Sequence, residues 1–589
     1  MFVKPSLNEV LLHTPDSQEW LYFHHPEHVL TAYRTEDLPD LLSEIEREVN
    51  LRNRFAAGFL SYDAAPTFDP ALQVKSTVQE NLPLSWFGIY RELSRLPSAA
   101  VASKCDQDAN IFFGPWQPDV TELSYRRAIQ NIKEKISHGE TYQVNFTYRL
   151  HASCYKPAWT VFAGLAVAHA APYAAFLETE AWALCSISPE LFFTLNGNTL
   201  TSRPMKGTAS RGNTLEDDLR QARWLHHSGK NQAENIMIVD MVRNDLGRIA
   251  RIGSICVPEI FQVEKYPTVW QMTSTIQGET KAGLSEILRA LFPAASITGA
   301  PKVRTMQIIS NLESSSRGAY TGAIGYYGPQ RQAQFNVAIR TLFYNKLGKE
   351  VEYGVGGGIV FDSVPEDEWE ETITKSRILH ESSRHFDLLE TMRWTPEEGW
   401  FLLAQHLDRL KKSAAYFSYP FETSAIHESL SRSEAGFNGI ARMVRLMLSR
   451  DGQVSIQSQP LLQRTNPSRV CIARSPTNSS NRFLYHKTTR REPYQKALAE
   501  CPGYDEVLLW NERGEITEAC TANLVADLYG ELVTPPVESG LLAGTYRAWL
   551  LKSGKMVERT ILVQELTKCS RLFLVNSVRG MWKIKVDLL

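Results

Sequence analysis

Two glutamates and a lysine share one face of a helix that the sequence predicts over residues 366–380. Glu368, Glu371 and Lys375 are spaced at i, i+3 and i+7, which places them on one side of a helix. Two carboxylates one turn apart could hold Mg²⁺, a hard cation that takes carboxylate and substrate oxygens. The alternative is a solvated acidic face with an ion pair between Glu371 and Lys375. Taken alone, the spacing favours the solvated face.

Two other segments of the front half carry residues that could act on an anionic substrate. Gly356, Gly357 and Gly358 form a run that would let backbone N–H groups approach an anion without a Cβ clash, although a tight strand turn is the commoner cause of such a run. Lys206 lies between a predicted strand end and the Gly207–Thr208 turn. A lysine with a depressed pKa is a nucleophile, whereas an exposed turn lysine does no chemistry.

The back half contains a second lysine and glutamate. Lys487 lies in a basic turn, and Glu518 ends the second strand of a hairpin whose turn is at Gly514. On the hairpin evidence alone, Lys487 is a solvated lysine and Glu518 an ordinary carboxylate at a strand end.

The composition narrows the class of protein that has to position these residues. The chain has 589 residues, and at roughly 100–200 residues per domain this predicts three to five structural units. Lys plus Arg is 63 and Asp plus Glu is 65, without a basic cluster, which argues against a nucleic-acid partner. The 13 Trp, 22 Tyr and 25 Phe exclude disorder as the main state.

The eight cysteines are scattered and include no C-x-x-C pair, which argues against a zinc site and a disulfide framework. No apolar secretory segment opens the sequence, so we expect a reducing, cytoplasmic setting. Residues 157–177 contain no Asp, Glu, Lys or Arg and have about the length of a membrane span. Because Pro172 interrupts them, a buried helix to about Ala170 and a strand over Tyr173–Leu177 explain the stretch better.

Helices and strands alternate along the chain, with a fresh start near residue 380. We therefore predict divisions into residues 1–110, 111–380 and 381–589. Helices are predicted over 121–138, 216–246 (one or two helices), 366–380 and 406–416, and strands over 184–195, 199–203, 323–327, 334–344, 351–355 and 386–394.

Seven motifs occur together in a fixed order over roughly residues 50–380. They are Ser188–Glu190, Pro204–Thr208, Ala233–Asn235 with Val239–Arg248, Ile297–Lys302, Ala338–Arg340, Gly356–Gly358 and the Glu368–Lys375 helix. Together they resemble the chorismate-utilising enzymes, a family that includes anthranilate, aminodeoxychorismate, isochorismate and salicylate synthases. The resemblance implies an α+β fold, in which a large chorismate-binding α/β sandwich is followed by a smaller domain.

Lys206 discriminates between branches of that family. Anthranilate synthases carry Ala at this position, whereas aminodeoxychorismate synthases carry Lys. The resemblance implies that Lys206 attacks chorismate at C2 and expels the 4-hydroxyl group, after which ammonia adds at C4, and that Glu190 protonates the departing hydroxyl. Asn235 and Gln271 stand where anthranilate synthases often carry His, which is compatible with this branch.

The remaining site residues are also carried over from the resemblance. The Mg²⁺ site would be formed by Glu234, Glu368 and Glu371. The substrate carboxylates would be bound by Thr298, Arg340, Gly356, Gly357, Gly358 and Lys375. No Gly-x-Cys-x-Gly motif surrounds a cysteine, so we expect ammonia to come from a separate glutamine amidotransferase subunit or from free ammonia.

The back half, over about 386–589, resembles the fold-type IV pyridoxal-phosphate enzymes. The matching segments are His406–Leu410, Lys487, the Gly514–Glu518 hairpin, Leu542–Arg547 and Asn576–Ser577. The resemblance implies that Lys487 forms the Schiff base with pyridoxal 5′-phosphate and that Glu518 bonds the protonated pyridine nitrogen. The phosphate would be held by Arg409, Thr545, Tyr546 and Ser577.

Within that family, Glu518–Leu524 is closest to the aminodeoxychorismate lyases. Lys487 would remove a ring proton, and loss of pyruvate would leave an aromatic ring. Members of this family also suggest a homodimer formed through this half. They normally begin with about 25–30 further residues, whereas only ten residues separate Lys375 from Phe386 here.

Two families that act in succession on one metabolite predict a bifunctional enzyme that makes 4-aminobenzoate for folate. The alternatives are a synthase fused to a transaminase-like domain of other specificity, and a back half that binds no cofactor and only docks the amidotransferase. Anthranilate synthesis is disfavoured by Lys206.

Overall fold

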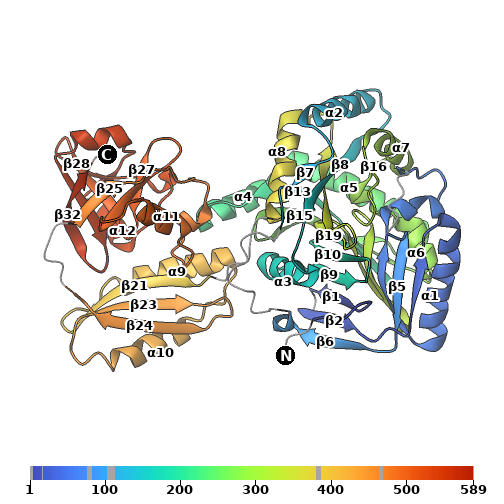
Figure 1. Cartoon of the computed structure of the whole chain (residues 1–589), viewed down its shortest axis with the longest axis horizontal. Coiled ribbons are helices and arrows are strands. Elements are labelled where there is room, and N and C mark those ends of the chain that lie inside the picture. Colours follow the sequence, from blue (N-terminus) through green and yellow to red (C-terminus); the bar gives the residue numbers. More distant parts are fainter. Residues whose placement is uncertain are drawn as a thin grey trace. The chain divides into compact units, whose positions relative to one another are not determined.

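A computed structural model describes residues 4–15, 17–75, 82–101, 113–379, 386–462 and 468–587. The chain forms two compact units, the first made of Met1–Ala209 and Trp224–Ser383, the second of Ser210–Arg223 and Arg384–Leu589. Figure 1 shows both units. The predicted divisions at 110/111 and 380/381 lie outside the described residues, as does Cys105. The first unit includes residues on both sides of 110/111.

Two large sheets form the centre of the first unit. The first sheet has the order β16 (Gly299–Ala300), β8 (Gln143–Ser153), β20 (Glu350–Ile359), β19 (Thr341–Asn345), β10 (Trp182–Ser188), β9 (Tyr173–Glu178), β1 (Val10–Thr14), β2 (Glu19–Phe23) and β6 (Leu93–Pro97), and β7 (Gln117–Pro118) also pairs with β8. The second has the order β13 (Met205–Ser210), β15 (Val269–Glu279), β12 (Thr199–Arg203), β11 (Leu191–Asn196), β18 (Gln332–Val337), β17 (Ala323–Gly328), β4 (Phe55–Leu60), β5 (Ser85–Tyr90) and β3 (His28–Ala32), and β14 (Cys256–Lys265) also pairs with β15.

Three hydrophobic cores hold these sheets and their helices together. One lies between the sheets, where Leu12 and Phe23 of one sheet pack with Phe59 of the other. Helices cover the outer faces because each helix presents one apolar side to a sheet. The helices on the second sheet are α1 (Leu38–Arg52), α5 (Gly229–Gly247) and α6 (Leu284–Leu291). The helices on the first sheet are α2 (Glu122–Ser137), α3 (Ala158–His169) and α8 (Pro365–Ser376). Helix α7 (Lys302–Leu312) contributes side chains to the cores on both sheets.

Most predicted elements of this unit are confirmed, but two predicted strands are interrupted. The run 184–195 divides into β10 and β11 around Pro189–Glu190, and the run 334–344 divides into β18 and β19 around Ala338–Arg340. Arg340 has φ 51°, a left-handed conformation that breaks a strand. Each break contains a residue that the sequence analysis assigns to the site, Glu190 in the first and Arg340 in the second. The Gly356–Gly358 run, in contrast, is neither a loop nor a turn, because β20 continues through it.

The uncharged stretch 157–177 folds as predicted. It forms α3, which ends at Ala170 in a left-handed conformation, followed by β9. No helix within the described ranges is long and apolar enough to cross a membrane.

The second unit combines a small sheet and a larger, closed one. The small sheet has the order β22 (Gly399–Trp400), β21 (Leu388–Thr395), β23 (Arg442–Leu448) and β24 (Val454–Pro460), with α9 (Leu403–Phe417) and α10 (Thr423–Glu434) packed on it. The other runs β27 (Ile516–Ala519), β26 (Glu506–Trp510), β25 (Ser468–Ile472), β32 (Gly580–Asp587), β31 (Arg571–Asn576), β28 (Asn523–Leu528), β29 (Glu531–Thr534) and β30 (Val557–Glu558). An additional pairing of β27 with β28 closes six of these strands into a ring.

Candidate active sites

Lys206 lies on β13 and points toward the triple-glycine strand β20. A Cβ built on Gly358 would lie 2.3 Å from Lys206 Nζ and 2.6 Å from Gln143 Nε2, so only glycine leaves room for the two side chains. Burial of the amine lowers the pKa of Lys206, while the charges of Glu234, Glu371 and Glu190 act in the opposite direction. A lowered pKa increases the fraction of neutral amine, which is the nucleophilic form.

Glu190 lies at the break between β10 and β11, and its carboxyl group is buried. Ser296 donates a hydrogen bond to Glu190 Oε1 at 2.6 Å. Burial raises the pKa of Glu190 to about 7, against the opposing effects of Ser296 and of the nearby charge of Lys206. A carboxyl group with this pKa can carry a proton at neutral pH and release it in a reaction.

Gln143, at the start of β8, was missed by the sequence analysis. Its side chain is fully buried, and neither Nε2 nor Oε1 has a hydrogen-bond partner within the described part of the chain. An unbonded buried amide costs free energy, so this amide is placed to bond a ligand beside Lys206. In the sequence, Gln143 reads as one polar residue in a strand, and no local signal separates it from others.

The acidic face of α8 lies against the middle glycine of β20. A Cβ built on Gly357 would lie 3.1 Å from Glu368 Oε2 and 3.8 Å from Glu371 Oε1. Lys375 Nζ contacts Glu371 Oε1 at 2.6 Å and donates to the Gly356 carbonyl at 2.8 Å. Burial raises the pKa of Glu368, and the nearby charge of Glu371 adds to this effect. Despite burial, the pKa of Glu371 is instead lowered by the charges of Lys375 and Lys206. A cation at this site would relieve the destabilisation of the Glu368 carboxylate.

The predicted Mg²⁺ ligands are only partly brought together. Within the described ranges, no group of three or more His, Cys, Asp or Glu side chains converges as a metal cage. Glu368 and Glu371 share one site, whereas Glu234 comes from α5 and is linked to it through its effect on the pKa of Lys206. A pair of carboxylates fits Mg²⁺, which commonly keeps waters and takes its other ligands from the substrate.

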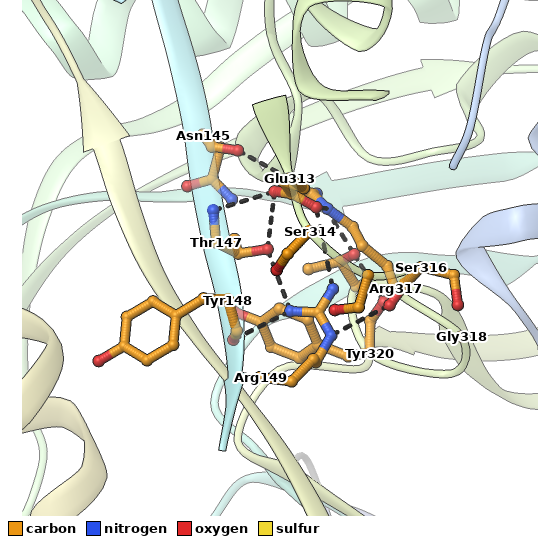
Figure 2. Close-up of polar contacts among 12 residues, drawn as sticks. Asn145, Thr147, Tyr148, Arg149, Glu313, Ser314, Ser316, Arg317, Gly318 and Tyr320 are labelled. Carbon is orange, nitrogen blue, oxygen red and sulfur yellow. Dashed lines mark hydrogen bonds and ion pairs between the residues drawn. The ribbon is translucent and has the colours of Figure 1, made fainter. Parts of the chain in front are cut away.

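A buried ion-pair network fixes the loop that carries Thr298. Arg317 donates to the carbonyls of Ile297 at 2.8 Å and Asn145 at 2.7 Å, and it pairs with Glu313 at 2.7 Å. Glu313 in turn accepts hydrogen bonds from the Thr147 backbone and hydroxyl, as Figure 2 shows. Both charged side chains are no more than 3% exposed. The pair therefore ties β8 to the 297–298 loop in one geometry.

Thr298 and Arg340 have the surroundings expected of ligand-binding side chains. Thr298 is fully buried, and its hydroxyl donates to the carbonyls of Ala294 and Ala295, which leaves its oxygen lone pairs available. Arg340 is half-buried, and its guanidinium makes no hydrogen bond or ion pair to any residue that the structure describes. A partly buried, unpaired guanidinium is suited to a carboxylate.

The second unit has a cavity of about 410 Å³ between the small sheet and the closed one. Its lining includes Lys487, Glu518, Arg409, Thr545 and Ser577, five of the six residues predicted to bind the cofactor in this half. Burial, together with the charge of Arg409, lowers the pKa of Lys487 to about 8. The amine is still mainly protonated at physiological pH, but its neutral fraction is far larger than that of an ordinary lysine.

Glu518 is held by three hydrogen bonds at the floor of this cavity. Tyr494 OH donates to Oε1 at 2.7 Å, the Leu542 backbone to Oε1 at 3.2 Å, and Asn523 Nδ2 to Oε2 at 3.2 Å. Burial raises the pKa of Glu518 to about 7. A buried carboxyl group at this pKa is suited to a protonated ring nitrogen, which would supply the missing positive charge. Tyr494 and Asn523 were not identified from the sequence.

The residues predicted to hold the phosphate differ in whether their side chains line the cavity. Arg409 lines the cavity but also forms a bidentate ion pair with the buried Glu390, at 2.9 and 2.6 Å. Thr545 begins α12 (Thr545–Lys552), where free backbone N–H groups favour an anion. The Tyr546 side chain does not line the cavity, and its ring stacks on Trp549 at 5.5 Å. Only the Tyr546 backbone remains to contact a phosphate.

Comparisons with known proteins identify both units. Residues 7–381, more than half of the chain, match the model of the chorismate binding enzyme family, and residues 387–586 match amino-transferase class IV. The chain therefore belongs to the chorismate binding enzymes and carries an amino-transferase class IV domain after the chorismate-binding part.

Among curated relatives, aminodeoxychorismate synthase component 1 of Bacillus subtilis (strain 168) is 40% identical over 286 residues, which cover 48% of this chain and 60% of that protein. The protein of the same name from Escherichia coli (strain K12) is 42% identical over 267 residues, covering 45% and 58%. The chain thus spans about 60% of the length of these relatives. Anthranilate synthase component I from Streptococcus pneumoniae TIGR4 has the same fold as the first unit, with a TM-score of 0.53, 22% identity and coverage of 65% and 94%.

Proposed function

We propose that the chain makes 4-aminobenzoate from chorismate in two successive steps. The first unit would convert chorismate and ammonia into 4-amino-4-deoxychorismate and water, and the second would divide that product into 4-aminobenzoate and pyruvate. The observation that carries the proposal is the buried amine of Lys206, which lies against Gly358 and near Glu190. The names of the curated relatives support the first step.

In the first step, the residues of the site have complementary tasks. Neutral Lys206 adds to C2 of chorismate, and protonated Glu190 gives its proton to the 4-hydroxyl group as that group leaves. Ammonia then adds at C4, and release of Lys206 restores the amine. Arg340 would bind a substrate carboxylate through charge-assisted hydrogen bonds in a site shielded from water. The Thr298 hydroxyl would bind a carboxylate by turning its proton from the Ala294 and Ala295 carbonyls to the substrate.

The metal role of this unit rests on two carboxylates. Glu368 and Glu371 would hold Mg²⁺, with Glu234 as a further ligand. The ion would neutralise the ring carboxylate of the substrate and orient it. Lys375, which contacts Glu371, would keep the charge of the pair balanced.

In the second step, Lys487 would act as both anchor and base. Pyridoxal phosphate, when bound, supplies a ring that withdraws electrons from the bond being broken. Glu518 would keep the pyridine nitrogen protonated, and Arg409 with Thr545 and Ser577 would hold the phosphate. Lys487 removes the ring proton of the substrate, pyruvate leaves, and the aromatic product forms, so aromatisation supplies much of the driving force.

Product analysis tests both steps. The purified chain is incubated with chorismate, Mg²⁺, pyridoxal phosphate and a high concentration of an ammonium salt, and the products are resolved by chromatography and mass. We expect 4-aminobenzoate and pyruvate in equal amounts. Aminodeoxychorismate accumulating alone would refute the second step, and anthranilate would refute the role of Lys206. Replacing the ammonium salt with glutamine alone should give no product, because we propose that a separate amidotransferase subunit supplies ammonia.

A cofactor-free second unit is the competing function to exclude. Lys487→Ala should remove the visible absorbance that pyridoxal phosphate acquires on binding to the lysine, while aminodeoxychorismate formation continues. A parent chain with no such absorbance would favour a docking role for this unit.

A further inference from the structure

A segment of the first half of the sequence is built into the second unit. Ser210–Arg223 follows β13, the strand that carries Lys206, yet these residues form one compact unit with residues 384–589. Within the segment, Arg211 and Asp218 form a bidentate ion pair at 2.6 and 2.7 Å, and their side chains are 6% and 1% exposed. The Gly212 backbone donates to the same carboxylate at 3.1 Å. Burial of a closed ion pair indicates a fixed, packed structure and not a surface loop.

This segment docks on α9. The Arg211 guanidinium lies 4.5 Å from the centre of the Tyr416 ring and donates to the Tyr416 carbonyl at 2.9 Å. In return, the Tyr416 hydroxyl donates to the Gly212 carbonyl at 2.7 Å. Tyr416 is 1% exposed, so the contact is desolvated. Charge-assisted bonds and a cation–π contact in a dry environment hold residues 211 and 212 against the helix.

The next residue of the segment reaches His486, the neighbour of Lys487. The Asn213 carbonyl lies 3.1 Å from His486 Nε2, and Ser413 Oγ of α9 lies 3.0 Å from His486 Nδ1. A carbonyl only accepts, so Nε2 carries the proton and Nδ1 accepts from Ser413. Burial lowers the pKa of His486 to about 4, which keeps the ring neutral. The ring also packs on Tyr416 with centroids 4.3 Å apart.

The backbone on the other side of Lys487 is fixed as well. The Leu389 N–H donates to the Lys487 carbonyl at 2.9 Å, and Thr488 forms a bridge with Leu388. Lys487 is therefore held between β21 and the anchored ring of His486. We infer that Arg211, Gly212 and Asn213, held in place by Asp218, are part of the second active site, where they anchor His486 as a positioning residue that directs Lys487 toward the cofactor. This inference rests on the proposed role of Lys487.

Binding of pyridoxal phosphate to the full chain tests the inference. The cofactor is titrated into the apoprotein, and its dissociation constant is read from the visible absorbance that arises at the lysine. His486→Phe keeps the packed ring but removes both hydrogen bonds, so we expect at least a tenfold higher dissociation constant. His486→Gln keeps an amide donor for the Asn213 carbonyl and should stay within threefold of the parent. Asp218→Asn, which leaves Arg211 without its counter-charge, should weaken binding as His486→Phe does.

Glu216→Gln is the matched control within the same segment. Glu216 forms an exposed ion pair with Lys412, at 2.9 Å, and should leave cofactor binding unchanged. Aminodeoxychorismate formation by the first unit, measured in every variant, reports that the first unit is folded, and thermal unfolding of each variant reports the state of the second. Equal binding by His486→Phe and the parent would overturn the inference, as would His486→Gln binding as weakly as His486→Phe. A parent that gives no absorbance would instead overturn the proposed role of Lys487.

Discussion

Among the residues that the structure describes, burial raises the pKa of three carboxyl groups to about 7, namely Asp63, Glu190 and Glu518. Glu190 and Glu518 belong to the two candidate sites, where a group that titrates near neutrality is useful. Asp63 differs, because it lies beside the ion-pair network and one of its carboxylate oxygens has no partner within the described residues. The same physical cause would therefore serve the proposed chemistry at Glu190 and Glu518 and would cost stability at Asp63.

Asp63 should make the stability of the first unit depend on pH. Between about pH 4 and 7 the folded chain keeps a proton on Asp63 that the unfolded chain has released, so the free energy of unfolding falls as the pH rises through this window. Each pKa unit between the folded and unfolded chain corresponds to about 1.4 kcal/mol. In Asp63→Asn, the free energy of unfolding should therefore fall by a few kcal/mol less over this pH window than it does in the parent. Thermal unfolding at pH 5 and pH 8 measures the difference. The exposed Asp40→Asn serves as the control, and an unchanged slope in Asp63→Asn would contradict the assignment.

Glu190 should set the alkaline limb of the first reaction. Its protonated form is the proton donor, so kcat/KM should decline above about pH 7, the raised pKa of the carboxyl. Glu190→Gln should lower the rate by about 10²–10⁴-fold and abolish this decline. The profile is measured from pH 6 to 9 at a constant concentration of un-ionised ammonia. A variant that keeps the parent's alkaline limb would show that another group is responsible.

At the scale of elements, β20 explains why three glycines stand in a row. Gly356 and Gly358 are surrounded by different atoms: a Cβ on Gly356 would lie 2.2 Å from the Phe146 carbonyl oxygen of β8, whereas one on Gly358 would meet the ends of two flexible side chains. Gly356 therefore allows β20 to pair closely with β8, and Gly358 leaves room for the Lys206 and Gln143 side chains in the candidate site. The sequence pattern left an anion-binding loop and a tight strand turn open, because glycine runs do not reveal whether backbone or side chains crowd them.

Alanine substitutions should separate these two roles. Gly358→Ala should displace Lys206 and Gln143 by about 1 Å, lower kcat/KM of the first reaction by on the order of 10²-fold and leave unfolding nearly unchanged. Gly356→Ala should instead destabilise the unit by about 1–3 kcal/mol through overpacking against a backbone atom. Steady-state kinetics and thermal unfolding on both variants provide the comparison. If the two variants changed kcat/KM and thermal stability to the same extent, the distinction between the two glycines would be refuted.

The sequence predicted the positions of whole helices and strands better than the breaks within strands. β12 occupies the predicted range Thr199–Arg203, and α2 lies one residue inside its predicted bounds at each end. The breaks at Glu190 and Arg340 were not predicted, because the apolar residues on both sides continue a strand pattern. Gln143 was missed for a similar reason, since its importance arises from Gly358 and Lys206, which reach it only through the fold.

At the scale of the whole molecule, the residues assigned to each reaction come from a single unit. Those of the first reaction belong to the first unit, and Lys487 with its partners belongs to the second. Neither set of assigned residues includes a side chain from the other unit. The sequence did not predict that residues 210–223 belong to the second unit, because local periodicity identifies a helix and not the surface that the helix packs on.

Two inactive variants should therefore complement each other in solution. Lys206→Ala should make no aminodeoxychorismate but keep the absorbance of pyridoxal phosphate bound to Lys487, and Lys487→Ala should do the reverse. Mixed in equal amounts with chorismate, Mg²⁺, pyridoxal phosphate and ammonium, they should form 4-aminobenzoate at a rate that rises with protein concentration. Chromatography of timed samples gives the rate. Failure of the mixture, with each variant retaining its own activity, would mean that both reactions must occur within one chain.

The placement of Ser210–Arg223 also constrains how the protein is made. During synthesis these 14 residues leave the ribosome before the 160 residues that separate them from Arg384. At about 5–20 residues per second, the segment waits roughly 10–30 s before the rest of its unit begins to emerge, while the sequences on both sides of it can already fold. A gene cut near codon 380 would therefore yield a second product that lacks part of its own interior, so the placement of this segment favours keeping the two units in one reading frame.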